Sequence, residues 1–199
     1  MSSKLWMMTM LVAACSSGVP TERAAAPVPV PVSPVEVTVA ADPEPSIYDL
    51  PIELRDARDR VIGLDVARGK PVLIAMFYAS CPVACPVLLQ EVKTIVAELP
   101  AALQDEVRIV MVSFDAERDT PAKLTALMQE RGLDSRWTVA AAKDPDARAL
   151  AATLGVKYRK LDNGEFFHGA TIVALDREGR PVARTDQLGQ RGVLAAALR

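Results

Sequence analysis

The sequence predicts an α/β fold in which a central mixed β-sheet is flanked by helices. Two continuous apolar runs, PVLIAMFYA at 71–79 and EVRIVMVSFD at 106–115, have the length of strands that are buried on both faces. Segments with helical spacing follow both runs, so strands and helices alternate along the chain. Two late segments, 156–167 and 170–184, have the turn residues of β-hairpins, which add antiparallel pairs to the sheet.

The first predicted elements are a hairpin and two helices. LPIELRDARDRVIGLDVARGK, at 50–70, indicates a short N-terminal hairpin. The segment 86–99 has apolar side chains at the spacing of one helical face, namely Leu88, Val92, Ile95, Val96 and Leu99. Asp119 and Thr120 are interpreted as caps of a second helix, in which Pro121 is the first residue.

The second half of the chain continues the alternation. WTVAA, at 137–141, predicts a short strand, and 144–155 predicts a helix that ends at a glycine. The two hairpins turn at Asn163-Gly164 and at Glu178-Gly179. The tail at 190–199 predicts a last helix.

The composition fits one globular domain, which we place at 46–199, and no nucleic-acid partner is expected. Half of the residues are apolar, the net charge is −2, and acidic and basic residues are mixed along the chain. Met76 and Met111 lie inside the apolar runs, so we interpret them as core residues rather than as soft metal ligands.

The N-terminus resembles a bacterial lipoprotein signal. One early positive charge is followed by an apolar run of roughly ten residues, about half of what a bilayer span needs. Ala13 and Ala14 lead directly into Cys15, where a lipid would be attached. We therefore predict a signal peptide at 1–14 and a lipidated Cys15 that begins a Pro/Ala/Val-rich tether over 15–45. A plain signal peptide with an incidental cysteine is the alternative.

Two cysteines lie four residues apart in FYASCPVACP, at 77–86, between a predicted strand and a predicted helix. Pro86 fits the first position of that helix, which places Cys85 near the cap and Cys81 on the preceding loop. The partial positive charge of a helix N-terminus favours thiolate over thiol. Thiolates serve both redox exchange and metal binding, so position alone does not choose between these uses.

Three uses of the cysteine pair are open. A structural disulfide would close a very short loop and would therefore contribute least to stability. A redox pair is typical of thioredoxin-like proteins, whose cysteines lie at this junction with one residue fewer between them. The third use is a site for a soft ion such as Cu(I), for which His168, the single histidine of the chain, would be a third ligand.

Three segments together resemble the signatures of the Sco/SenC family: FYASCPVACP, VSFDAERDTPAKL and FFHGATIVALDREG. The resemblance implies a thioredoxin-like fold and copper as the bound ion. It implies that Cys81 and Cys85 are the metal-binding thiolates and that His168 is the histidine ligand. It also implies that Asp115 is an acidic residue next to the site.

The chain departs from the family pattern at two positions. Ala116 stands where proline is usual, and Phe167 stands where an aspartate often precedes the histidine. The second departure removes an acceptor that could orient the histidine ring.

The function that the resemblance implies is that of a copper chaperone rather than an enzyme. The chain would be lipid-anchored on the periplasmic side of a bacterial membrane and would deliver copper to the copper-centre subunit of a cytochrome c oxidase. The alternative is a thiol–disulfide oxidoreductase that reduces the cysteines of the oxidase copper site or of other exported proteins. In that case Cys81 would attack and Cys85 would resolve. A third interpretation is an inert binding module with neither activity.

Overall fold

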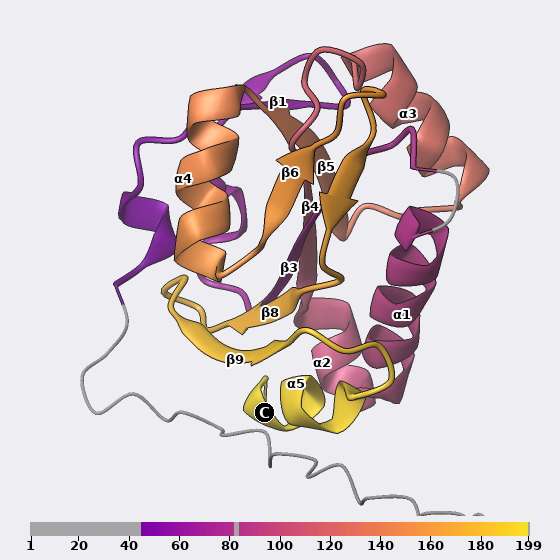
Figure 1. Cartoon of the computed structure of the whole chain (residues 1–199). Coiled ribbons are helices and arrows are strands. Elements are labelled where there is room, and N and C mark those ends of the chain that lie inside the picture. Colours follow the sequence, from indigo (N-terminus) through magenta and orange to yellow (C-terminus); the bar gives the residue numbers. More distant parts are fainter. Residues whose placement is uncertain (1–44, 82–83, 199) are drawn as a thin grey trace, which may run out of the picture. The chain divides into compact units, whose positions relative to one another are not determined.

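A seven-stranded sheet lies at the centre of the structure, with the strand order β2-β1-β5-β4-β3-β8-β9 (Figure 1). The computed structural model describes residues 45–81 and 84–198, which lie in the second of two compact units of the chain, Val37–Arg199. The strands of this sheet are β1 (Leu54–Asp56), β2 (Val61–Ile62), β3 (Val72–Phe77), β4 (Arg108–Ser113), β5 (Trp137–Ala142), β8 (Ile172–Leu175) and β9 (Pro181–Thr185). A separate two-stranded sheet contains β6 (Tyr158–Lys160) and β7 (Phe166–His168).

The sheet is mixed, as predicted. β3 is parallel to β4 and β4 is parallel to β5, whereas β8 is antiparallel to β3 and to β9. The N-terminal hairpin β1–β2 is also confirmed, and it joins the sheet because β1 pairs antiparallel with β5.

Helices cover both faces of the sheet. They are α1 (Ala84–Glu98), α2 (Ala101–Glu106), α3 (Pro121–Glu130), α4 (Asp144–Leu154) and α5 (Arg191–Ala197). The connections from β3 to β4 and from β4 to β5 step in the same direction along the sheet, so right-handed crossovers place α1 and α3 on the same face. The chain then returns across the sheet, and α4 lies on the opposite face (Figure 1).

The core forms around β3, in which all six residues are buried. The predicted apolar face of α1 packs on this core, and its five predicted positions are all buried. Met76 and Met111 have exposed fractions of 1% and 0%, which confirms them as core residues. Burial on both faces is the property that a continuous apolar strand indicates.

The helix with Cys85 begins two residues earlier than we predicted, at Ala84 rather than at Pro86. Pro86 lies within the first turn, where backbone N–H groups have no intrahelical partner, so its missing donor costs nothing there. Cys85 consequently lies inside the first turn instead of near the cap. The prediction for α3 is confirmed, because the Thr120 side chain accepts a hydrogen bond from the Lys123 N–H group.

Three short elements were not predicted. They are α2 and the 3-10 helices η1 (Ile47–Asp49) and η2 (Leu64–Ala67), which are too short to show a hydrophobic period. The predicted signal peptide, Cys15 and the tether lie outside the described residues. Within residues 45–81 and 84–198, no helix combines the length and the apolar character needed to cross a membrane.

The turn between β8 and β9 packs against η1. The Ile47 N–H group donates to the Gly179 carbonyl at 2.9 Å, and the Ser46 hydroxyl donates to the Glu178 carbonyl at 2.5 Å. Gly179 has a φ angle of 81°, and a Cβ atom at this position would lie 2.5 Å from the Tyr48 ring. Glycine is therefore required here for two reasons, the backbone conformation and the contact with the ring.

Asp56 organises the turn between β1 and β2. Its carboxylate, in a residue with an exposed fraction of 4%, accepts hydrogen bonds from the N–H groups of Arg58 and Arg60, both at 2.9 Å, and from the Arg60 side chain at 2.8 Å. Burial raises the pKa of Asp56, but the hydrogen bonds from Arg60 and Arg58 lower it by more, so that the pKa lies below its usual value.

Asp56→Asn should therefore destabilise the protein at pH 7, by about 1.5–3 kcal/mol for hydrogen bonds to a charged group. Because the folded-state pKa is the lower one, this stabilisation is complete above the unfolded-state pKa and disappears as the pH falls through the folded-state pKa. The difference in free energy of unfolding between the variant and the wild type, measured by urea unfolding, should shrink towards pH 3. The matched control is Asp59→Asn in the same turn, whose exposed ion pair with Arg55 contributes little. If this difference in free energy of unfolding were unchanged at low pH, the stabilisation would not come from the ionised Asp56 carboxylate.

Gly179→Ala should destabilise the protein more than Gly164→Ala does. Both glycines have positive φ angles, of 81° and 80°, but a Cβ atom at Gly164 has no neighbour within 4 Å. The backbone cost of about 1–2 kcal/mol is then common to both variants, and only Gly179→Ala adds about 1–3 kcal/mol for overpacking against Tyr48. Thermal unfolding of the two variants measures this difference, and equal shifts would show that the ring moves aside freely.

Candidate metal centre

Cys81, Cys85 and His168 meet at one end of the sheet, although His168 is more than eighty residues away in the sequence. One ligand atom from each residue lies within 4.8 Å of the other two. Cys81 follows β3 on the loop, Cys85 lies in the first turn of α1, and His168 is the last residue of β7. In β7, His168 pairs with Tyr158 of β6.

The imidazole of His168 is held so that one nitrogen is available. Nδ1 lies 2.9 Å from the Gly169 carbonyl, and since a carbonyl can only accept, Nδ1 carries the proton and the lone pair of a neutral ring is on Nε2. Nε2 is buried and has no hydrogen-bond partner among the described residues. The Gly169 carbonyl thus orients the ring, and the Phe167 side chain is 65% exposed.

The two cysteines are thiols and differ in their surroundings. Cys81 is partly buried, while Cys85 is buried and donates a hydrogen bond from Sγ to the Tyr78 carbonyl at 3.0 Å. Burial raises the pKa of the Cys85 thiol. The helix N-terminus was expected to favour thiolate, but desolvation has the larger effect at Cys85. An ion bound here must displace this proton.

These three side chains fit a soft metal ion. Two sulfur ligands and one imidazole are the donors that Cu(I) prefers. Within the described residues Nε2 is a buried polar group without a partner, which a metal ion would satisfy. A cavity of about 20 Å³ beside Cys81 and Cys85 is also lined by Leu127 and Arg131 and not by His168, so it is not the space between the three ligand atoms.

The loop that leads to Cys81 is held from the start of α3. The Asp119 carboxylate accepts hydrogen bonds from the Ala79 N–H group at 2.6 Å and from the Ser113 hydroxyl at 2.5 Å. Lys123 donates to the hydroxyl of Ser80. The sequence indicated only a capping role for Asp119, because no local pattern reveals a contact between residues forty positions apart.

Asp115 is buried and forms an ion pair with Arg118, and it is not a member of the Cys81–Cys85–His168 group. Arg118 also pairs with Glu165 at 3.1 Å, and Glu165 accepts a hydrogen bond from the Tyr78 hydroxyl at 2.8 Å. Asp115 is thus connected to the site through other side chains. Arg118, Glu165 and Tyr78 were missed in the sequence, since their charges and hydroxyl have no distinguishing spacing.

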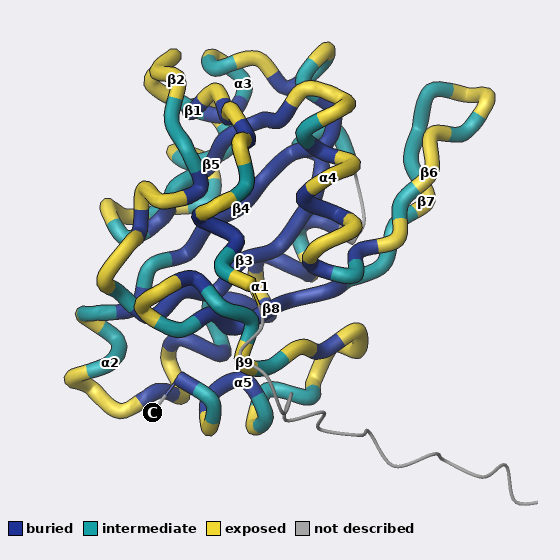
Figure 2. Tube along the Cα trace, turned by 90° about the vertical axis from the view of Figure 1, so that its left-hand side faces the viewer, coloured by how far each residue is buried: buried dark blue, intermediate teal, exposed yellow. Residues whose placement is uncertain are grey.

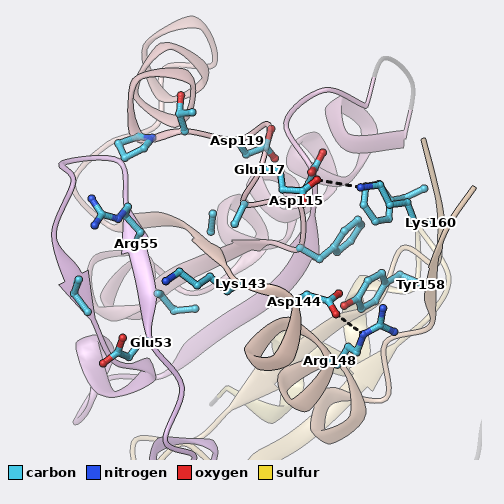
Figure 3. A pocket seen from close by; sticks show the side chains of 18 of the residues that line it. Glu53, Arg55, Asp115, Glu117, Asp119, Lys143, Asp144, Arg148, Tyr158 and Lys160 are labelled. Carbon is cyan, nitrogen blue, oxygen red and sulfur yellow. Dashed lines mark hydrogen bonds and ion pairs between the residues drawn. The ribbon is translucent and has the colours of Figure 1, made fainter. Parts of the chain in front are cut away.

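An aromatic cluster separates the site from a larger groove. Phe114 and Phe166 each contact the ring of Tyr78, with centroid separations of 5.6 and 5.3 Å, and Phe114 stacks on Tyr158 at 4.5 Å. Phe114, Phe166 and Tyr158 also line a groove of about 920 Å³. Figure 3 shows this groove between Arg55 on one side and Tyr158 and Lys160 on the other. The two cysteines and His168 do not line it.

Comparisons with known proteins agree with the fold. A structure of Bradyrhizobium japonicum ScoI with copper bound has 25% sequence identity and a TM-score of 0.60, over 74% of this chain and 92% of that chain. A SCO1/SenC family lipoprotein from Bacillus anthracis has 18% identity and a TM-score of 0.65, over 76% of this chain and 92% of that chain. These similarities confirm the predicted thioredoxin-like α/β fold.

A curated Stutzerimonas stutzeri protein, whose name describes it as copper-binding, is 29% identical over 73 residues. The match covers 37% of this chain and 36% of that protein, so it spans about a third of the relative's length. The SCO1/SenC family profile matches residues 40–199. The chain therefore belongs to the SCO1/SenC family.

Proposed function

We propose that the chain binds one copper ion through Cys81, Cys85 and His168 and delivers it to the copper-centre subunit of a cytochrome oxidase. The observation that carries this proposal is the convergence of three ligand atoms within 4.8 Å, one of them a buried nitrogen that no described residue hydrogen-bonds. Family membership supports copper as the ion, as do the copper-bound ScoI structure and the name of the Stutzerimonas stutzeri relative.

Three ligands suit a protein that gives its ion away. A three-coordinate Cu(I) site accepts a further thiolate more readily than a closed four-coordinate site does. Thiolates of the recipient would replace the ligands of this chain one after another, so that copper is never released into water. Partly buried Cys81 is the ligand on the loop after β3, while Cys85 is buried in the first turn of α1.

The first 45 residues would anchor this domain to the membrane. In this proposal the segment 1–14 is a signal peptide, Cys15 carries lipid, and 15–45 is a tether to the domain at 46–199 on the periplasmic side of a bacterial membrane. The motif Val-Ala-Ala-Cys supports lipidation. A structural neighbour from Bacillus anthracis is described as a lipoprotein.

Cys15→Ser should release the protein from the membrane. Without the acceptor thiol no lipid is attached, and the variant lacks the acyl chains that stable membrane anchoring requires. We expect the wild type in the membrane fraction of fractionated cells and the variant in the soluble periplasmic fraction. Cys15→Ser should still bind copper. A wild-type protein that is soluble after cleavage would favour the plain signal peptide.

His168→Ala should weaken copper binding strongly. The substitution removes one of three ligands, so we expect a loss beyond the about 10–100-fold that removal of an outer hydrogen-bond partner costs. The measurement is an anaerobic titration of the reduced full chain with Cu(I) against a competing chelator. Phe167→Ala, which changes an exposed neighbour on the same strand, is the matched control and should bind like the wild type. Copper binding that is indifferent to His168 would refute the three-ligand site.

A second candidate function is thiol–disulfide exchange, and the different burial of the two cysteines favours it. A more exposed thiol next to a buried one is the arrangement of an attacking and a resolving cysteine. In this case Cys85→Ser should accumulate mixed disulfides through Cys81, and His168→Ala should retain exchange activity. A chain whose cysteines neither exchange nor bind copper tightly would be an inert module.

A further inference from the structure

The two halves of the site belong to separate parts of the fold. The cysteines lie at the junction of β3 and α1, within the seven-stranded sheet, its flanking helices and the loops that join them, here called the main layers. His168 lies on the two-stranded sheet β6–β7. In the described part of the chain, this small sheet is not paired with the seven-stranded sheet. Figure 2 shows the β6–β7 hairpin extending away from the buried centre of the fold. The position of His168 relative to the cysteines therefore depends on side chains that connect the hairpin to the main layers.

Part of this connection is apolar. The face of the hairpin that contains Tyr158, Phe166 and His168 packs on Phe114, with centroid separations of 4.5, 4.9 and 5.4 Å. Aromatic packing excludes water and has preferred ring geometries, but these add only about 0.5–1.5 kcal/mol per pair beyond the burial of area. It holds the hairpin against the protein, and hydrogen bonds to charged groups add a stronger directional preference.

The directional part of the connection passes through Tyr78. The carbonyl of this residue accepts hydrogen bonds from the Cys81 N–H group at 3.2 Å and from the Cys85 thiol at 3.0 Å. Its hydroxyl donates to Glu165 on the hairpin at 2.8 Å. Tyr78 thus contacts both cysteines with its backbone and the hairpin with its side chain, and with an exposed fraction of 3% it has little freedom to move.

Glu165 is held in turn by Arg118. Arg118 donates to Glu165 at 3.1 Å and to Asp115, and its guanidinium lies over the rings of Tyr78 and Phe166 at 5.6 and 5.8 Å. Since Asp115 is buried and paired, Arg118 is a fixed donor rather than a free surface cation. Glu165 therefore has two directional partners, and both of them belong to the main layers.

We propose that the Tyr78–Glu165–Arg118 network positions His168 over the cysteines and so sets how tightly the third ligand is held. The inference rests on the proposed copper site and extends it: these three are positioning residues that act through His168. His168 lies at the base of the hairpin, where its ring contacts the ring of Tyr78 at 5.6 Å, and the network also fixes Glu165, next to the turn. Loosening the network would favour a two-thiolate site, from which copper passes more readily to a recipient.

The first test needs no copper. Hydrogen–deuterium exchange of the full chain should be faster at the backbone amides of 158–168 in Glu165→Ala and in Tyr78→Phe than in the wild type. Glu117→Gln is the matched control, because it breaks a different, exposed ion pair, that of Glu117 with Lys160 at 3.1 Å, on the same hairpin. The control should exchange like the wild type. Wild-type exchange in Glu165→Ala and Tyr78→Phe would overturn the proposal.

The second test asks whether the network acts through His168. Glu165→Ala should bind Cu(I) about tenfold more weakly than the wild type, the effect typical of an outer partner of a ligand. In a His168→Ala background the same substitution should cause no further loss, since the ligand on which it acts is absent. An equal loss in both backgrounds would overturn the positioning role. If the wild type binds no copper, the proposed function fails by itself, while the exchange experiment still decides whether the network holds the hairpin.

Discussion

The burial of β3 between β4 and β8 is the constraint on which the rest of the structure depends. All six residues of β3 are buried, and its parallel and antiparallel neighbours fix its register on both sides. A slip by one residue would exchange the two faces of the strand, which is costly when both are packed. The end of β3 therefore has a defined position, and this position determines where Tyr78 and the cysteine loop begin.

Hydrogen bonds restrict the conformation of the cysteine loop that follows β3. Asp119 and Lys123, at the start of α3, hold Ala79 and Ser80, and the carbonyl of Tyr78 accepts from both cysteines. The loop is thus stabilised by hydrogen bonds from elements that are rigid for other reasons. Such preorganisation reduces the ordering cost of binding an ion.

The site balances two opposing electrostatic effects. The N-terminus of α1 favours a thiolate at Cys85, but burial disfavours any charge there and has the larger effect, so that the pKa of the thiol is raised. A buried thiol without an ion is protected from adventitious reaction. An incoming soft cation reverses the balance, because it supplies the compensating charge within bonding distance of the sulfur.

The sequence by itself determined the elements and the ligand types. Apolar runs such as 71–79 identify buried strands, and turn pairs such as Asn163-Gly164 identify hairpins, because both depend on side-chain period and backbone preference that act locally. Spacing also indicated the cysteine pair at the start of a helix, with an error of two residues at Pro86. The candidate ligand set relied in addition on the resemblance of three segments to a family. Only the tertiary structure decided which distant polar groups meet: that Asp119 holds the cysteine loop, and that Glu165 connects to Tyr78. These contacts join residues far apart in the sequence, and they form only when the packed sheet brings the segments together, so no local pattern encodes them.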